Sequence, residues 1–268
     1  MIISVIGAGV IGSAVAKALV ASSGKNRIIA SDKRVEQLSK LEKEGVETTT
    51  DNKKAAKTAD IIILCVKPSD MRTVLSEIRN EVKEKLVISM AAAVNLELLK
   101  KCAPQAKIIR AMPNLAIIVR ESFTAYCPER DFSSKDREIV ESILRSFGTV
   151  SVVEEDKMDA VTALSGCAPG YLSSLMELIV QGGTEIGLPT ELALTALAQS
   201  MIGTGKIILE TKKSPADVMK MVATPGGVTE EELSELSKYP LQKAFRSTLQ
   251  AGVEKSRKIT NKLLNECQ

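Results

Sequence analysis

The hydrophobic residues in the first half of the chain are grouped in short continuous runs, and stretches with helical spacing separate these runs. The runs cover residues 2–6, 27–30, 61–66, 86–90, 107–112, 122–127 and 149–153. A strand that is buried on both faces of a parallel sheet has such a continuous apolar sequence. The alternation of runs and helical stretches therefore predicts a βαβ series with a parallel sheet and right-handed crossovers.

The helices predicted in this half begin at residues that are typical of helix starts. Asp51 and Asn95 are N-cap candidates for short helices, the second of which ends near Cys102. Pro68 suits the first turn of a helix over 68–79, because its missing N–H needs no partner there. Further helices are expected over 10–21, 34–44 and 133–147.

The pattern changes near residue 154. No convincing strand follows that point, and helices are expected over 156–185, 190–210, 214–222, 229–237 and 240–265. We therefore predict two domains, an α/β domain over 1–154 and an all-helical domain over 155–268. The stretch 191–210 has apolar residues on nearly every face, so it must be buried. Either a homodimer interface or a central place in the helical domain would bury it.

Composition narrows the classes of function. The 268 residues are 44% hydrophobic and 26% charged, as in a soluble globular protein. A net charge of +3 and an aromatic content of 3% give no argument for a nucleic acid or an anionic membrane as partner. The chain has no histidine, which excludes Ser-His-Asp and Cys-His nucleophiles and every His-ligated metal site. We expect no metal, so the chemistry must come from a cofactor or from other side chains.

The cysteines and the apolar segments indicate a cytoplasmic protein. Five cysteines, at 65, 102, 127, 167 and 267, form no CxxC motif and indicate reduced thiols. No basic residue precedes the apolar N-terminal segment, and Lys17 interrupts it, so it does not match a secretion signal. Residues 61–66, the longest purely apolar run elsewhere, are too few to cross a bilayer.

A glycine motif follows the first apolar run. Gly7, Gly9 and Gly12 match GxGxxG, with Val10 and Ile11 between the last two glycines, and a helical stretch follows directly. In a Rossmann domain the first glycine makes the turn, the second lets a pyrophosphate approach, and the third lets helix and strand pack closely. The helix N-terminus adds N–H donors and a positive dipole. The motif therefore predicts an NAD(P)-binding Rossmann domain with a parallel sheet.

The residues after the second apolar run bear on the choice of nucleotide. Asp32 lies at the spacing expected of a carboxylate that binds the ribose 2′-OH, which favours NAD. Lys33 and Arg34 follow it, and these cations could hold the 2′-phosphate of NADP, although both also suit a solvated helix start. The sequence leaves the preference between NADH and NADPH open.

Three further motifs lie at the ends of apolar runs: Val66-Lys67-Pro68, Ala91-Ala92-Ala93 and the segment RAMPN at 110–114. The carboxyl ends of parallel strands are where open α/β sheets bind ligands. Two longer motifs, 153–171 and 224–233, lie in the helical half. Through these segments the chain resembles the pyrroline-5-carboxylate reductase family from its first strand to its last helix. Met112 and Asn114 of RAMPN are substrate-binding candidates.

The resemblance implies a Rossmann domain followed by a helical dimerisation domain, in a homodimer or a decamer. It implies NADPH- or NADH-dependent reduction of the cyclic imine 1-pyrroline-5-carboxylate to L-proline, in proline biosynthesis. It places the nucleotide against Asn52, Val66, Lys67, Pro68, Ala91, Ala92 and Ala93. It places the substrate against Glu155, Thr224, Gly226, Gly227, Val228 and Thr229. Lys67 and Thr229 are the candidate catalytic residues.

The chemistry is consistent with the absence of histidine. A cyclic iminium is activated by its own protonated nitrogen, so hydride transfer from a nicotinamide needs no histidine to polarise it. The Pro225-Gly226-Gly227 turn offers backbone N–H groups to a substrate carboxylate, and a simple interhelical turn explains it equally well. Thr229 also matches the T-x-x-E capping box with Glu232, so it could only start a helix.

Some residues depart from the family pattern. Leu115 replaces the usual Thr after RAMPN, Cys167 and Ala168 alter the usual SGSGPAY, and Ala93 replaces a common glycine. These changes keep alternatives open: a related imine reductase, a β-hydroxyacid-type dehydrogenase, or a dinucleotide-binding protein without turnover. A β-hydroxyacid dehydrogenase would carry a catalytic lysine on its first long helix after the Rossmann domain. Residues 166–180 contain no lysine, which argues against that class.

Overall fold

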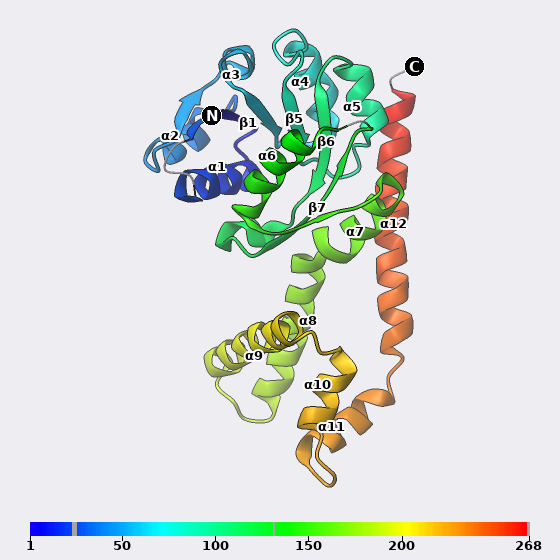
Figure 1. Ribbon diagram of the computed structural model, residues 1–268. Helices are drawn as coiled ribbons and strands as arrows, with labels where there is room; N and C mark the ends of the chain where they lie inside the picture. The colour runs from blue at the N-terminus through cyan, green and yellow to red at the C-terminus, as the bar shows by residue number, and fades with distance from the viewer. Residues whose placement is uncertain (23–25, 131, 267–268) are drawn as a thin grey trace. The chain divides into compact units, whose positions relative to one another are not determined.

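The computed structural model describes residues 1–22, 26–130 and 132–266, so Cys267 lies outside the described residues. The chain divides into two compact units (Figure 1). The first contains residues 1–169 together with 249–268, and the second contains residues 170–248. The end of the chain therefore belongs to the same unit as its beginning. The predicted boundary near residue 154 stays a prediction.

The first unit is built on one eight-stranded sheet with the order β3-β2-β1-β4-β5-β6-β7-β8. The strands are β1 (Ile2–Ile6), β2 (Arg27–Ser31), β3 (Glu47–Thr49), β4 (Ile61–Leu64), β5 (Leu86–Ser89), β6 (Lys107–Met112), β7 (Ser122–Pro128) and β8 (Gly148–Val152). The seven apolar runs therefore form strands, as predicted. The additional strand, β3, has the polar sequence Glu-Thr-Thr at the sheet edge, so hydrophobic patterning gave no signal for it.

Helices cover both faces of this sheet. They are α1 (Val10–Ser22), α2 (Val35–Glu42), α3 (Asn52–Thr58), α4 (Met71–Glu77), α5 (Leu96–Cys102) and α6 (Ser134–Arg145). Ile3 and Val5 of β1 pack in a cluster with residues of α1, α2 and α6. Ile62 and Leu64 of β4 pack in a second cluster with residues of α4 and α5. Successive strand residues point to opposite faces, which is why continuous apolar runs were needed.

The predicted helix starts are correct in three cases. The side chain of Asp51 accepts a hydrogen bond from the backbone N of Lys54, and Asn95 does the same for Leu98. Pro68 begins a short 3-10 turn, η1 (Pro68–Asp70), which leads into α4.

One strand pair contradicts the expectation of a parallel sheet throughout. β6 and β7 are antiparallel, whereas the other neighbouring strands are parallel. The connection between them contains only the 3-10 turn η2 (Leu115–Val119). A parallel crossover needs a dozen or more residues, so this short connection forces the chain to reverse.

Helices alone follow β8, and residues 153–266 contain no strand, as predicted. The elements are η3 (Glu155–Lys157), α7 (Met158–Val161), the π-helical turn η4 (Thr162–Gly166), α8 (Ala168–Glu185), α9 (Thr190–Thr211), α10 (Pro215–Val222), α11 (Val228–Ser237) and α12 (Leu241–Asn265). Residues 249–265 of α12 belong to the first unit, where Leu263 and Leu264 pack against the same cluster as α4 and α5.

α9 is not buried within its own chain. Only Ala193 of this helix is buried, and Ile202 and Leu209 are 53% and 67% exposed. This excludes a central place in the helical part as the explanation of its apolar faces. By length and composition, α9 and the helical stretch 155–185 would also be long and apolar enough to cross a membrane, which is weak evidence for a span.

Candidate active site

The predicted cofactor-binding residues gather at one edge of the sheet. They follow the carboxyl ends of β1, β2, β4 and β5, and Asn52 follows β3. These strands are neighbours in the order β3-β2-β1-β4-β5, and all their pairings are parallel. From β1 the chain continues to β2 and β3 on one side of the sheet, and then crosses to β4 on the other side of β1. Open α/β sheets bind ligands at the carboxyl ends of the strands beside such a switch point.

Two of the three motif glycines are required by the protein itself. Gly7 has φ +97°, and a β-carbon on it would lie 2.8 Å from the carbonyl oxygen of Cys65. A β-carbon on Gly12 would lie 1.8 Å from the carbonyl oxygen of Gly7. These glycines therefore make the turn and allow helix α1 to pack closely on the sheet.

Gly9 differs from the other two. Its φ is not in the left-handed region, and the nearest atom to a β-carbon would be a guanidinium nitrogen of Arg34 at 3.9 Å. No contact within the described residues requires glycine at this position. The space beside Gly9 is open at the N-terminus of α1, where backbone N–H groups and the helix dipole favour an anion. The residues present therefore fit a dinucleotide pyrophosphate.

Asp32 holds the glycine turn and Arg34 together. Its carboxylate accepts hydrogen bonds from the backbone N of Ala8 at 2.8 Å and from the backbone N of Arg34 at 2.9 Å. Two guanidinium nitrogens of Arg34 also donate to it, each at 2.9 Å. The hydrogen bond from the Arg34 side chain is the main cause that lowers the pKa of Asp32 to about 2. The carboxylate predicted to bind the ribose is thus occupied by protein donors, and Lys33 beside it is exposed.

The residues after β4 and in α3 have different environments. The side chain of Lys67 is exposed and has no ion pair among the described residues. Val66 and Pro68, on either side of it, are partly buried. The Asn52 side chain accepts from the Ser31 hydroxyl and donates to Glu77 at 2.9 Å. The amide of Asn52 is therefore held at the end of β2, beside the glycine turn.

The three alanines after β5 are largely buried, and Ala93 has the left-handed conformation with φ +59°. Its carbonyl oxygen accepts a hydrogen bond of 2.9 Å from the hydroxyl of Thr260 on α12. Sequence reasoning missed Thr260, because 167 residues separate the two partners and no motif connects them.

The end of β6 contacts the π-helical turn η4. Asn114 accepts from the backbone N of Ala116 and so caps η2, and its amide donates to the carbonyl oxygen of Ser165 at 3.2 Å. A β-carbon on Gly166 would lie 2.4 Å from the methyl carbon of Met112. Met112 and Asn114 are therefore brought against the same short turn, and π-helical turns are frequent at functional sites.

Glu155 belongs to a partly buried ion-pair network. It accepts from Arg110 at 2.8 Å and from the backbone N of Leu96 at 3.2 Å. Arg110 is 3% exposed, and its second terminal nitrogen lies 3.9 Å from Asp159. That nitrogen and the second carboxylate oxygen of Glu155 have no hydrogen-bond partner. In this network Glu155 joins β6, α5 and η3, and its expected contact with substrate stays a prediction.

The second unit contains the turn that leads into α11. Gly226 has φ +71°, and its backbone N donates to Glu230 at 2.8 Å. A β-carbon on Gly227 would lie 2.5 Å from the hydroxyl oxygen of Thr224. Both glycines are thus required by the turn.

The capping box predicted for Thr229 is wrong. Helix α11 begins at Val228 with Gly227 as its N-cap residue, so Thr229 is already the second helical residue. No side chain caps this helix start. The extended backbone of Gly227, φ −87° and ψ 165°, takes the N-cap place two residues earlier than the sequence motif indicated. The hydroxyl of Thr229 is therefore not used as a cap.

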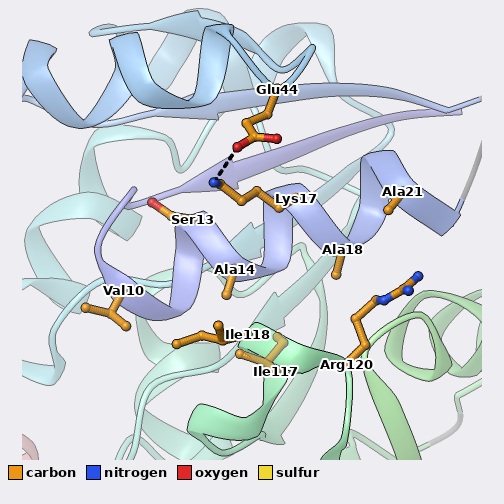
Figure 2. A pocket seen from close by; sticks show the side chains of 10 residues that line it. All are labelled: Val10, Ser13, Ala14, Lys17, Ala18, Ala21, Glu44, Ile117, Ile118 and Arg120. Carbon is orange, nitrogen blue, oxygen red and sulfur yellow. Dashed lines mark hydrogen bonds and ion pairs between the residues drawn. The ribbon is translucent and has the colours of Figure 1, made fainter.

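A pocket of about 440 Å³ lies beside α1 (Figure 2). Ala14 and Ala18 line it on the side of α1 that faces Ile117 and Ile118, whereas Lys17 and Glu44, paired at 2.7 Å, lie on the other side of the helix in this view; Ala21 also lines the pocket. The lining also includes Val10, Ser13, Ile117, Ile118 and Arg120. Val10 is the only predicted cofactor-binding residue among them, so this pocket is not the predicted nucleotide site.

The described residues contain no cluster of side chains suited to bind a metal ion. Residues 1–22, 26–130 and 132–266 contain no group of three His, Cys, Asp or Glu side chains that could hold a metal ion. Burial raises the pKa of the Cys65 thiol to about 12, and burial is also the main cause that raises the pKa of Cys127 to about 12. Neither thiol is therefore a reactive nucleophile near neutral pH.

Two family profiles match the chain. The profile described as pyrroline-5-carboxylate reductase dimerisation matches residues 155–259. The profile described as NADP oxidoreductase, coenzyme F420-dependent, matches residues 2–93. The chain therefore carries a dimerisation domain, and the glycine motif lies in an oxidoreductase nucleotide domain.

Relatives match over nearly the full length. The pyrroline-5-carboxylate reductase of Methanosarcina acetivorans is 34% identical over 97% of this chain and 98% of its own. The Coxiella burnetii pyrroline-5-carboxylate reductase structure has a TM-score of 0.90 and 31% identity, over 96% of this chain and 98% of that one. The Plasmodium falciparum pyrroline carboxylate reductase, solved with NADP bound, has a TM-score of 0.85 and 26% identity, over 96% and 97%. With a glycine turn built for a dinucleotide and relatives of this extent, the chain belongs to the pyrroline-5-carboxylate reductase family.

Proposed function

We propose that this protein catalyses the NADPH- or NADH-dependent reduction of 1-pyrroline-5-carboxylate to L-proline. Full-length membership of the family supports the reaction. The observation in the structure that carries the proposal is Gly9. It is the motif glycine that no contact within the described residues requires, and a bound pyrophosphate gives a reason for it.

Different segments of the chain would bind different parts of the nucleotide. Ala8 N donates to Asp32, which fixes the turn, and the N-terminus of α1 then faces the open space beside Gly9. Backbone N–H groups at Val10 and Ile11 would bind the pyrophosphate there. The segments 66–68 and 91–93 would hold the nicotinamide half at the ends of β4 and β5.

When bound, the reduced nicotinamide would supply a hydride to the imine carbon. The residues around the substrate bind and orient it. The turn before α11 would offer backbone N–H groups to the substrate carboxylate, and the Thr229 hydroxyl would serve the imine nitrogen as hydrogen-bond partner or proton donor. Lys67 is exposed at the end of β4, where its ammonium group would add positive charge near the bound nucleotide.

We also propose a cytoplasmic homodimer, with a decamer as the larger assembly. The apolar and exposed faces of α9 lie within the segment that matches the dimerisation profile, which supports self-association through this helix. This assembly would bury the two apolar helices without a membrane.

A turnover assay tests the reaction. The purified full-length protein is mixed with 1-pyrroline-5-carboxylate and NADH or NADPH in parallel, and oxidation of the nucleotide is followed together with formation of proline. We expect saturable oxidation of at least one nucleotide with an equal amount of proline. If neither nucleotide is oxidised under conditions in which the protein is folded, the proposed reaction is wrong.

A second candidate is a related imine reductase with a different ring. Leu115 is 44% exposed beside Asn114, and Cys167 is exposed after η4, so two of the departures from the family lie around the Asn114–Ser165 contact. A six-membered cyclic imine carboxylate run in the same assay distinguishes the candidates. A higher kcat/KM for that substrate than for 1-pyrroline-5-carboxylate would favour the second.

A further inference from the structure

The loop after β5 has a backbone conformation that its sequence disfavours. Ala93 lies in the left-handed region with φ +59°, and its side chain is 1% exposed. A residue with a β-carbon pays a steric cost in this region, so the conformation persists only where the surrounding structure holds it. The same loop, Ala91–Ala93, is expected to line the nucleotide. Whatever holds Ala93 therefore also sets the shape of the nucleotide site.

Thr260 of α12 contacts this loop at Ala93. Its hydroxyl donates to the carbonyl oxygen of Ala93 at 2.9 Å, and the alternative acceptor, the carbonyl oxygen of Ser256 within the same helix, lies farther away at 3.2 Å. The side chain of Thr260 is half-buried, so water competes weakly for this hydrogen bond.

Contacts on both sides of Thr260 fix the part of α12 that carries it. Gly252, Ser256 and Thr260 follow at intervals of four residues and share one helix face. A β-carbon on Gly252 would lie 3.0 Å from the side chain of Ala163, and Ser256 donates to Asp159 at 2.6 Å. Beyond Thr260, Leu263 packs on the hydrophobic cluster of α4 and α5. The helix therefore presents the Thr260 hydroxyl to Ala93 from a fixed position.

We propose that Thr260 is a positioning residue for the nucleotide, acting through the Ala91–Ala93 loop. The inference rests on the proposed function, since it takes this loop as part of the nucleotide site. Without the hydroxyl, Ala93 can relax towards negative φ, and the peptide groups that face the nucleotide move. Thr260 itself touches neither nucleotide nor substrate, so the effect is on nucleotide binding and not on the chemical step.

The test compares Thr260→Val, which keeps the shape and removes the donor, with Thr260→Ser, which keeps the donor. We expect Thr260→Val to raise the dissociation constants of NADPH and NADH about 10-fold by calorimetry, which corresponds to about 1.4 kcal/mol. The KM for nucleotide should rise by a similar factor, while kcat stays nearly unchanged. Thr260→Ser should return the dissociation constants and KM to wild-type values. Thr248→Val is the matched control, because the Thr248 hydroxyl bonds only within α12, to Ala244 at 3.0 Å.

The Ala93→Gly variant makes the test independent of the stability of Thr260→Val. Glycine adopts positive φ without strain, so the loop then needs less support. We expect nucleotide binding in the double variant Ala93→Gly/Thr260→Val to be within about 3-fold of that in Ala93→Gly alone. A full 10-fold loss in the glycine background would overturn the proposal, as would a Thr260→Val protein that melts at a lower temperature but binds nucleotide like wild type. If the wild-type protein binds neither nucleotide, the proposed function fails instead.

Discussion

The two units of this chain use hydrophobic residues in different ways. In the first unit, alternate residues of the strands enter two clusters that helices cover, so apolar side chains are buried within the chain. In the second unit, residues 170–248, only Val180 and Ala193 are buried, although α8 and α9 are rich in Leu, Ile and Met. The first sequence specifies a core, and the second specifies apolar helices that stay exposed within the chain, in a segment that matches a dimerisation profile. Hydrophobic patterning alone does not tell these two uses apart.

The first prediction tests whether the exposed apolar surface of α9 forms an interface with a second copy of the chain. Ile202→Glu should raise the dissociation constant of the homodimer at least about 1,000-fold, because symmetry places an unpaired charge in the interface from both copies. Light scattering at micromolar concentration should then give a mass of 28.8 kDa. Val35→Glu is the matched control, since Val35 is 57% exposed on α2 of the first unit, and this variant should stay associated. An associated Ile202→Glu protein would move the interface away from α9.

The second prediction concerns the glycine motif of the first unit, where substitution of Gly9 and of Gly12 should have different effects. Gly9→Val should weaken binding of both nucleotides at least about 100-fold while the protein keeps its fold, since the nearest protein atom to its β-carbon is an Arg34 nitrogen at 3.9 Å and the side chain would occupy the space for the pyrophosphate. Gly12→Val should fail to fold stably, because its side chain would collide with the carbonyl of Gly7. Calorimetry and circular dichroism measure the two effects. Normal nucleotide binding by a folded Gly9→Val protein would refute the assignment of the site.

The sequence predicted the strands and helix starts of the first unit far better than the pairing of its strands and the contacts between distant side chains. Seven strands follow from apolar runs, and the N-caps Asp51 and Asn95 follow from local chemistry. The polar edge strand β3 and the antiparallel direction of β7 depend on pairing with neighbours, so no local pattern showed them. The same limit applies to Arg110, whose burial against Glu155 no motif indicates.

The third prediction tests whether Thr229 in the second unit acts in chemistry. The structure removes its capping role, so Thr229→Ala should change the melting temperature by less than the roughly 2–4 °C that loss of a cap costs in a chain of this size. It should lower kcat at least about 10-fold, or about 1.4 kcal/mol of barrier, and Thr229→Ser should recover most of the rate. Wild-type turnover by the alanine variant would remove Thr229 from the catalytic residues.

The fourth prediction, with the smallest effect, is a pH dependence of stability in the first unit. The hydrogen bond from Arg34 lowers the pKa of Asp32 to about 2 in the folded protein, below its ordinary value of 3.8, so folding favours the carboxylate. Its contribution is therefore present above about pH 4 and is lost as the pH falls through about 2. Asp32→Asn should make urea denaturation less dependent on pH between about 2 and 4. Equal slopes in the wild-type protein and in Asp32→Asn would contradict the assignment.

Asp32 should also affect the preference between NADPH and NADH. Because Asp32 already accepts from Ala8 and Arg34, Asp32→Ser both removes a negative charge and releases the Arg34 guanidinium. We expect the ratio of kcat/KM for NADPH to that for NADH to rise. Arg34→Ala in the same background separates the two effects, and an unchanged ratio in Asp32→Ser would show that this carboxylate does not face the ribose.

The return of α12 to the first unit has a consequence for the order in which the protein folds during synthesis. The sheet and its helices are complete once residue 152 has left the ribosome, yet the partner of the Ala93 carbonyl is Thr260, 167 residues later in the chain. Domains generally fold as units as they emerge, and closing so long a loop is slow. The nascent first unit therefore lacks the Thr260 contact, and the packing of Leu263 and Leu264 on the α4–α5 cluster, until α12 has emerged. Nascent chains that end before α12 should thus bind nucleotide more weakly than the full chain, by at least the roughly 10-fold expected of Thr260→Val.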